Sequence, residues 1–228
     1  MKNPFFGGKA AVHVDFNIYL ITDRLLTRGI PLSSVVEQAL KGGVRAVQIR
    51  EKDLPTDDLF ALAKDIRRLT FQYGAKLLIN GRADIARNVH ADGVHLAERG
   101  SSVESSRNII GPGKLIGVSC HSLDSATLAQ EAGADFVTFG PIFSTPSKTA
   151  YGKPVGLELL SETVTALDIP VFGLGGINES NFLQVMAAGA RGVALISAIM
   201  ASADPRAAAE LLLKKLNYQR LTNQNDIG

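Results

Sequence analysis

The strongest constraint on the fold is an eightfold alternation between short apolar runs and segments with helical periodicity. Each apolar run is rich in β-branched residues and too short for a helix, which predicts a buried strand. The predicted strands lie at 17–22, 44–49, 76–80, 93–96, 114–119, 135–139, 170–174 and 192–196. Apolar residues recur at helical spacing after each run and predict helices at 31–41, 56–72, 83–89, 101–110, 123–131, 157–167, 178–188 and 204–218.

Eight strand–helix units are the number found in a TIM barrel, and 228 residues is near the lower end of its usual length. The near-continuous apolar strands are typical of a parallel sheet that is buried on both faces. A doubly wound sheet is the alternative, but it rarely shows eight such regular units. We therefore predict an α/β fold, a single TIM (β/α)8 barrel over 1–228, with an N-terminal arm at 1–15 and a frayed tail at 220–228.

Composition and charge exclude several classes of function. The net charge is +2 and the basic residues are scattered, so the sequence does not predict a nucleic-acid-binding surface. No apolar run approaches the roughly 18 residues of a membrane span, and the first ten residues lack the apolar core of a signal peptide. The single cysteine, Cys120, cannot form an internal disulfide, which fits a reducing compartment. We expect a cytoplasmic protein that binds a small molecule, and a homo-oligomer is compatible with the sequence.

The loop after the sixth predicted strand, GPIFSTPSKTAYGKP at 140–154, combines hydroxyl groups with a cation. Thr145, Ser147 and Lys148 are suited to a phosphate or diphosphate group. Arg50 and Lys52 follow the second strand and could reach the same ligand across the mouth of the barrel. The alternative is an ordinary solvated loop, because Ser, Thr, Pro and Lys are common loop residues.

A second phosphate site is predicted where the seventh and eighth strands end. Gly175 and Gly176 allow a close backbone approach, and Ile196 and Ser197 lie where exposed amides begin a helix. These two loops form the recurrent phosphate pocket of TIM barrels. The alternative is that the glycines only permit tight turns.

His121 follows the fifth predicted strand and is the candidate acid–base residue. Histidine changes charge near neutral pH, so it can move a proton at the mouth of the barrel. The alternative is that its ring satisfies a loop carbonyl. Cys120 fits a packed small side chain better than a nucleophile. The four histidines are dispersed and no cluster of carboxylates has metal-ligand spacing, so we predict no metal site.

At these positions the sequence resembles the thiamine phosphate synthase and TenI family, over nearly the whole chain. The matching segments are YLITD, VQIREKD, LLINGRADIA, ADGVHL, IGVSCHS, ADFVTFGPIFSTPSK, GLGGIN and GVALISAI. The resemblance implies a TIM barrel and a place in thiamine biosynthesis. It implies two candidate activities, a synthase and a tautomerase.

A synthase of this family joins hydroxymethylpyrimidine diphosphate to a thiazole phosphate and releases diphosphate. By resemblance, Gly176, Ile196 and Ser197 would bind the thiazole phosphate. Also by resemblance, the pyrimidine diphosphate would be bound by Gln48, Arg50, Lys52, Asn80, Ser119, Thr145, Ser147 and Lys148. The segments QIREK and GPIFSTPSK resemble the synthase pattern in particular.

Two departures from the synthase pattern concern magnesium. The resemblance implies two aspartates that bind the ion on the departing diphosphate, and Gly81 and Gly100 occupy their positions. Glycine cannot supply a carboxylate. The nearest acids are Asp84, inside a predicted helix, and Glu98, two residues short of the expected position. We therefore expect no cofactor, and Mg²⁺ only if the chain is a synthase.

The sequence Asn-Gly-Arg at 80–82 instead resembles TenI-type thiazole tautomerases. They move a proton on a thiazole carboxylate phosphate without a metal, and by resemblance His121 would move it. We therefore favour a thiazole tautomerase. The alternative is a thiamine phosphate synthase, and a further alternative is a non-catalytic regulator that binds a phosphate ligand.

Overall fold

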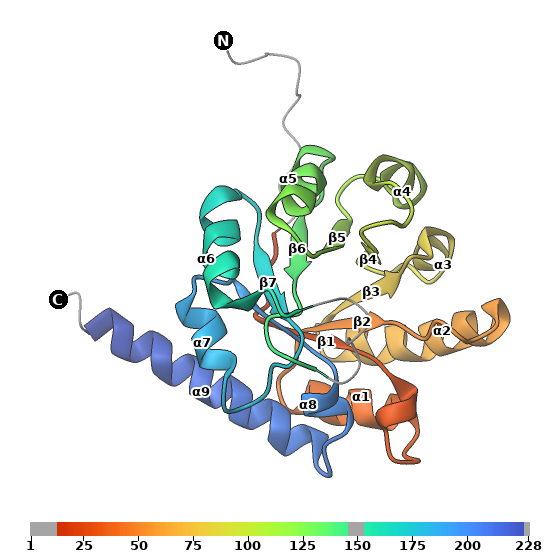
Figure 1. The fold of residues 1–228 in the computed structure, drawn as a ribbon. Helices are drawn as coiled ribbons and strands as arrows, with labels where there is room; N and C mark the ends of the chain where they lie inside the picture. The colour runs from red at the N-terminus through yellow and green to blue at the C-terminus, as the bar shows by residue number, and fades with distance from the viewer. Residues whose placement is uncertain (1–12, 146–152, 226–228) are drawn as a thin grey trace.

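The chain forms a closed barrel of eight parallel strands, seen in a computed structural model that describes residues 13–145 and 153–225, with side chains through 218. The strands follow one another around the barrel in chain order, and β8 pairs with β1 to close it. This confirms the predicted TIM barrel (Figure 1). The strands are β1 (Ile18–Ile21), β2 (Ala46–Ile49), β3 (Lys76–Asn80), β4 (Gly93–Leu96), β5 (Leu115–Cys120), β6 (Phe136–Phe139), β7 (Val171–Leu174) and β8 (Gly192–Leu195).

The helices surround the strands as an outer ring (Figure 1). They are α1 (Leu32–Lys41), α2 (Thr56–Gln72), α3 (Ala83–Asn88), α4 (Val103–Ile110), α5 (Leu123–Glu131), α6 (Gly156–Ala166), α7 (Phe182–Ala187), α8 (Ser197–Met200) and α9 (Pro205–Asn225). The periodicity of α2 explains its place: Leu59, Ala63, Ile66 and Leu69 lie on one face and are buried against the strands.

Two short elements lie outside the helix ranges predicted from the sequence. A 3₁₀ turn, η1 (Arg24–Leu26), follows β1, and the one-turn helix α8 follows β8. Helix α9 also continues to Asn225, beyond the end predicted at Tyr218. The predicted arm over 1–15 is too long, because Val14 is buried and its carbonyl accepts a hydrogen bond from Arg191 at 3.0 Å.

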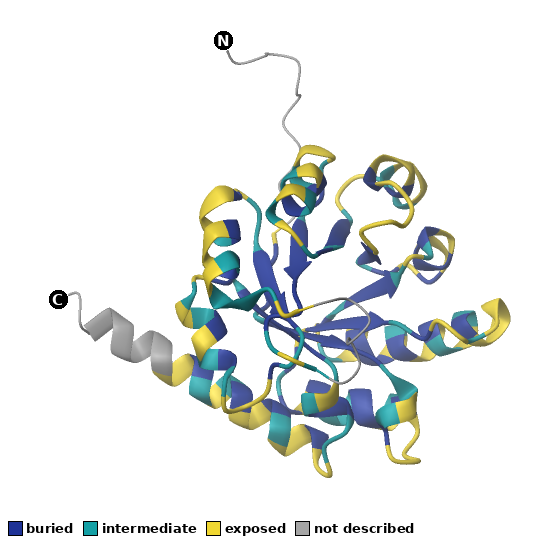
Figure 2. Ribbon diagram, viewed as in Figure 1, coloured by how far each residue is buried: buried dark blue, intermediate teal, exposed yellow. Residues whose placement is uncertain are grey.

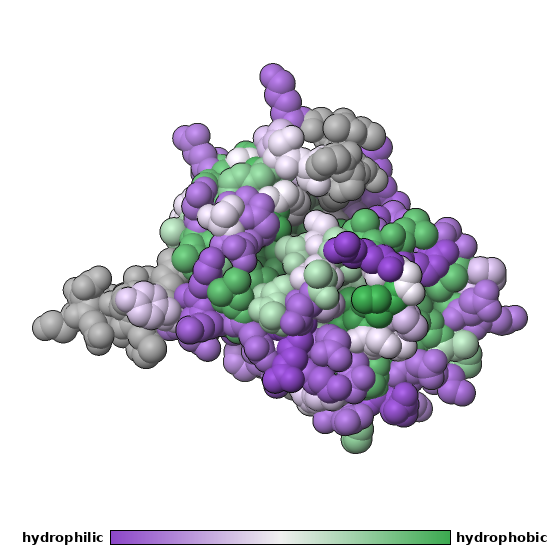
Figure 3. Space-filling view, turned by 90° about the horizontal axis from the view of Figure 1, so that it is seen from below, coloured by the Kyte–Doolittle hydropathy of each residue, from purple (hydrophilic) through white to green (hydrophobic). Residues whose placement is uncertain are grey.

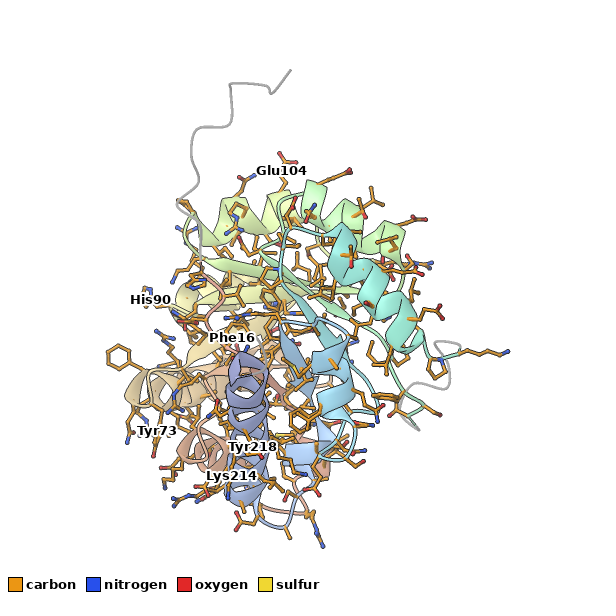
Figure 4. All side chains as sticks on the ribbon, turned by 90° about the vertical axis from the view of Figure 1, so that its left-hand side faces the viewer. Phe16, Tyr73, His90, Glu104, Lys214 and Tyr218 are labelled. Atoms are coloured by element: carbon orange, nitrogen blue, oxygen red, sulfur yellow. The ribbon has the colours of Figure 1, made fainter. Side chains whose placement is uncertain are left out.

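Alternate strand residues face two different cores. The strands are largely buried, whereas the surrounding helices also carry exposed residues (Figure 2). The outward-facing residues join the helices in the larger core, and the inward-facing residues fill the barrel. At the amino ends of the strands the filling is aromatic. The ring of Phe16, just before β1 (Figure 4), lies 5.2–5.8 Å from those of Tyr19, Phe136 and Phe172. This aromatic cluster closes one end of the barrel and leaves the other end for binding.

The outer surface is mixed in character. In the face shown in Figure 3, hydrophobic residues reach the surface in several places with hydrophilic residues between them. Among the described residues, no helix is both long enough and apolar enough to span a membrane.

Candidate active site

The predicted site residues lie at the carboxyl ends of the strands. Because all strands are parallel, these ends share one rim of the barrel. The rim residues come from β2 and its loop (Gln48, Arg50, Lys52), β3 (Asn80), β5 and its loop (Ser119, His121), the loop after β6 (Thr145), and the loops after β7 and β8 (Gly175, Gly176, Ile196, Ser197). Ser147 and Lys148 lie outside the described residues. The structure therefore brings the described candidates to one mouth.

A buried polar network lies beneath this mouth. The Gln48 side-chain amide donates to the Tyr19 hydroxyl at 3.0 Å, and that hydroxyl lies 3.4 Å from Nδ1 of His95. On the other side of the ring, Nε2 of His95 lies 3.0 Å from Oγ of Ser119 and 3.3 Å from Oγ1 of Thr138. The network ties together Gln48 and Ser119, two residues predicted to bind the pyrimidine diphosphate.

His95 is neutral in this network. Burial and, to a smaller extent, the positive charge of Arg50 together lower the pKa of its ring to about 3. A neutral ring has one donor and one acceptor nitrogen, so it can link the Tyr19 hydroxyl to the hydroxyls of Ser119 and Thr138. His95 lies at the carboxyl end of β4. It faces the barrel interior, just below the mouth, and is 2% exposed.

Tyr19 and Thr138 were missed by the sequence analysis. The signal that could have found them is the alternation of each strand, because Tyr19 and Thr138 share the inward phase of residues such as Gln48. Polar residues at inward positions near the carboxyl ends of barrel strands are candidates for supporting a ligand site.

His121 is positioned by the start of α5. Its backbone N–H donates to Oγ of Ser125 at 3.2 Å, and Ser122 and Ser125 form a capping box at the helix start. Its Nδ1 contacts the carbonyl oxygen of Gly140, at the end of β6. A carbonyl can only accept, so Nδ1 carries the proton and a neutral ring has its lone pair on Nε2. The sequence analysis gave a contact between the His121 ring and a loop carbonyl as the alternative to an acid–base role, and this contact is present. The same contact also fixes the tautomer that an acid–base residue needs.

The adjacent Cys120 is a packing residue, as predicted. Its side chain is buried among apolar neighbours. Burial raises the pKa of the thiol to about 12, so it is not a thiolate at neutral pH.

The glycines after β7 have a packing role. Gly175 and Gly176 have φ angles of +97° and +66°, which favour glycine. A Cβ on Gly175 would lie 2.6 Å from Cβ of Pro141, and one on Gly176 would lie 2.7 Å from Cβ of Phe143. The glycines thus let the β7 loop pack against the loop after β6. Across the rim, Ile196 is the N-cap of α8, so its neighbours' backbone amides begin a helix as predicted.

The rim between β2 and β3 is rich in positive charge. A cavity of about 380 Å³ is lined there by Lys52, Asn80 and Arg82, and also by Glu51, with apolar walls from β2, α2 and the loop between them. The charge of Arg50 lowers the pKa of Lys52, which means that the two cations lie near each other. Among the described residues, no ion pair joins Arg50 or Lys52 to a carboxylate.

The residues present do not fit the magnesium ion that a synthase of this family implies. At the two expected ligand positions, Gly81 has a φ of +66° and Gly100 lies in a turn, where its N–H donates to the Ala97 carbonyl at 2.9 Å. Neither position has a side-chain oxygen. In the described part of the chain, no group of three or more His, Cys, Asp or Glu residues is arranged to hold a metal ion.

These features define a TIM barrel with unpaired cations at its mouth among the described residues, and comparison with known proteins identifies its family. The family model described as thiamine monophosphate synthase matches residues 18–199. The chain belongs to this thiamine monophosphate synthase/TenI family, as the sequence resemblance had indicated.

Relatives and solved structures agree with this assignment. A Geobacter sulfurreducens protein, provisionally named a thiamine-phosphate synthase, is 57% identical over 89% of this chain and 95% of its own. A Roseiflexus thiamine-phosphate synthase is 43% identical over 86% of this chain and 83% of its own. The structure of a thiamine phosphate pyrophosphorylase from Pyrococcus furiosus has a TM-score of 0.81 and 38% identity, over 87% of this chain and 94% of its own.

Proposed function

We propose that this protein is a thiamine-phosphate synthase, which joins hydroxymethylpyrimidine diphosphate to a thiazole phosphate and releases diphosphate. Relatives that are 40–43% identical over most of the chain are named thiamine-phosphate synthase. These names favour the synthase over the tautomerase that the sequence analysis preferred. The structural observation that carries the proposal is the pair of cations, Arg50 and Lys52, that no carboxylate in the described chain neutralises. Such a pair is suited to a diphosphate.

In this proposal each half of the mouth binds one substrate. Arg50 and Lys52 hold the diphosphate, and Gln48 and Ser119, fixed by the network through His95, orient the pyrimidine. The amides that begin α8 and the backbone near Gly176 hold the thiazole phosphate. The reaction forms a bond between the pyrimidine methylene carbon and the thiazole nitrogen. It breaks the bond from that carbon to the diphosphate oxygen, which leaves with the bonding electrons.

The second candidate is a thiazole tautomerase. It is favoured by the glycines at positions 81 and 100 and by the histidine at position 121. The first two positions lack the expected carboxylates, and the Gly140 contact leaves the His121 lone pair on Nε2. In this reaction His121 would take a proton from one ring position of a thiazole carboxylate phosphate and return one to another. The third candidate, a non-catalytic binder of a phosphate ligand, remains if neither reaction occurs.

One experiment separates the three candidates. The purified protein is offered hydroxymethylpyrimidine diphosphate with thiazole phosphate, and separately the thiazole carboxylate phosphate tautomer, each with magnesium and with a chelator. We expect thiamine phosphate from the first pair. If the second substrate alone is converted, and His121→Asn abolishes the conversion, the protein is a tautomerase. If neither is converted, both enzyme proposals are wrong.

A further inference from the structure

The acidic residues beside the β2–β3 rim are already engaged with other groups. Glu51 is buried, accepts a hydrogen bond from Thr22 at 2.6 Å and from the backbone N–H of Arg24 at 3.2 Å, and pairs with the Arg24 guanidinium. Asp53 accepts two bonds of 2.6 Å from the same guanidinium, which lowers the pKa of its carboxyl to about 2. Both carboxylates therefore have a fixed cation as their partner.

Asp84 is engaged in the same way. The Arg82 guanidinium donates to both of its oxygens at 2.9 and 2.6 Å, and donates also to Oγ1 of Thr56 at 3.1 Å. Glu98 belongs to a different cavity, between the β4 loop and α5, where it lies with Ser125 and Leu128. The sequence of the loop at 146–152 contains no acidic residue. Among the described residues, Glu51, Asp53 and Asp84 are thus each paired with an arginine instead of being left for a divalent ion.

The cations at the same rim differ: Arg82 is paired with Asp84, whereas no ion pair among the described residues neutralises Arg50 or Lys52. Arg82 is held by Asp84 and Thr56 at the edge of the cavity that Lys52 and Asn80 also line. Arg50 occupies an inward phase of its strand, because Gln48, two residues earlier, bonds to Tyr19 inside the barrel. Its backbone N–H donates to Oγ1 of Thr22 at 3.0 Å, which holds the residue at the carboxyl end of β2, and its charge lowers the pKa of both Lys52 and His95. Among the described residues, the charges of Arg50 and Lys52 are therefore left for an incoming anion to balance.

We propose that this rim binds the diphosphate group without a divalent metal, through the side chains of Arg50, Lys52 and Arg82. Gly81 and Gly100 replace the carboxylates that would attract a metal, and the fixed guanidinium and ammonium groups supply the charge in its place. Arg guanidinium groups suit this role because they donate to two phosphate oxygens at once. The inference rests on the proposed diphosphate site, but not on the occurrence of the coupling reaction.

The test is a calorimetric titration of the whole protein with inorganic diphosphate in excess chelator and in magnesium. We expect binding in chelator for the unmodified protein, and a loss of at least about tenfold in affinity for Arg50→Gln. Arg87→Gln is the matched control, because Arg87 lines a separate cavity beside α3 with His90 and Lys114. Its affinity should equal that of the unmodified protein. Thermal unfolding shows whether each variant is folded.

A variant that restores a carboxylate at position 81 makes the test sharper. A Cβ on Gly81 would meet no atom within 4 Å, and Asp and Asn both tolerate a positive φ better than most residues. We expect Gly81→Asp to bind diphosphate about tenfold more weakly than Gly81→Asn in chelator, and to recover affinity when magnesium is added. The inference is overturned if the unmodified protein binds diphosphate only with magnesium, or if Arg50→Gln binds as tightly as Arg87→Gln. Binding in chelator without thiamine phosphate formation would remove the synthase proposal and leave this inference standing.

Discussion

The two ends of the barrel differ in what the inward-facing residues of the same strands do. At the amino ends, Phe16, Tyr19, Phe136 and Phe172 pack ring against ring. At the carboxyl ends, Ile21 and Leu174 are apolar, but several inward residues are polar and are joined through His95. Tyr19 belongs to both, because its ring is part of the aromatic cluster and its hydroxyl part of the network. We infer that the residues that stabilise the barrel and the residues that bind the ligand lie at opposite ends of its axis. Substitutions at each end test this separation.

The largest effect is expected at the aromatic end. Phe136→Ala removes a fully buried ring that contacts three rings of the aromatic cluster and the ring of His95, and should lower the free energy of unfolding by about 3–5 kcal/mol. Denaturant unfolding measures this loss. Diphosphate binding at a temperature where the variant is folded should persist. A variant with unchanged stability, or a folded variant that no longer binds diphosphate, would show that the two ends are not separate in this way.

A smaller effect is expected where the two ends meet. Tyr19→Phe keeps the ring but removes the hydroxyl that accepts from Gln48 and contacts His95. It should lower the free energy of unfolding by about 1–3 kcal/mol, because it leaves buried polar groups without a partner. It should also raise the KM for the pyrimidine diphosphate, since Gln48 loses its anchor. Equal KM values for the variant and the unmodified protein would contradict a positioning role for the network.

The pH dependence of stability tests the neutral state of His95. Its pKa is about 3 when folded and near 6.5 when unfolded, so the unfolded chain binds one more proton between these values. The His95 contribution to stability is therefore complete above about pH 6.5 and is lost as the pH falls towards 3. In that window the stability of the unmodified protein should fall about 1.4 kcal/mol per pH unit more steeply than that of His95→Gln. Denaturant unfolding at several pH values measures both slopes, and parallel slopes would mean that His95 is protonated in the folded protein.

The sequence predicted the barrel well because its signals are local and repeated. The bounds of α2, α5, β3 and β4 agree with the prediction, since each has clear periodicity and a clear start and end. The prediction of α7 began too early at Asn178, whose side chain accepts from the backbone N–H of Ser180 and forms a turn before the helix. Local alternatives of this kind compete with a helix and are hard to recognise from spacing alone.

The site was predicted less completely, for a different reason. Strand ends located Arg50, Lys52 and His121 at the mouth, because parallel strands bring their ends to one rim. The network from Tyr19 to Thr138 depends on contacts between strands far apart in the sequence, which no local pattern reveals. The pairing of Asp53 and Glu51 with Arg24 is of the same kind. This pairing neutralises the two carboxylates, and it therefore determines which charges at the rim remain available to a ligand.

The most direct test of the account is the rate of thiamine phosphate formation by the unmodified protein, Arg50→Gln and Arg87→Gln. The account predicts formation by the unmodified protein from hydroxymethylpyrimidine diphosphate and thiazole phosphate. It predicts a loss of at least about tenfold in kcat/KM for Arg50→Gln, because a charge-assisted contact to the diphosphate is removed. It predicts no change for Arg87→Gln, whose cavity lies apart from the rim. No product from the unmodified protein, or equal rates for the two variants, would contradict it.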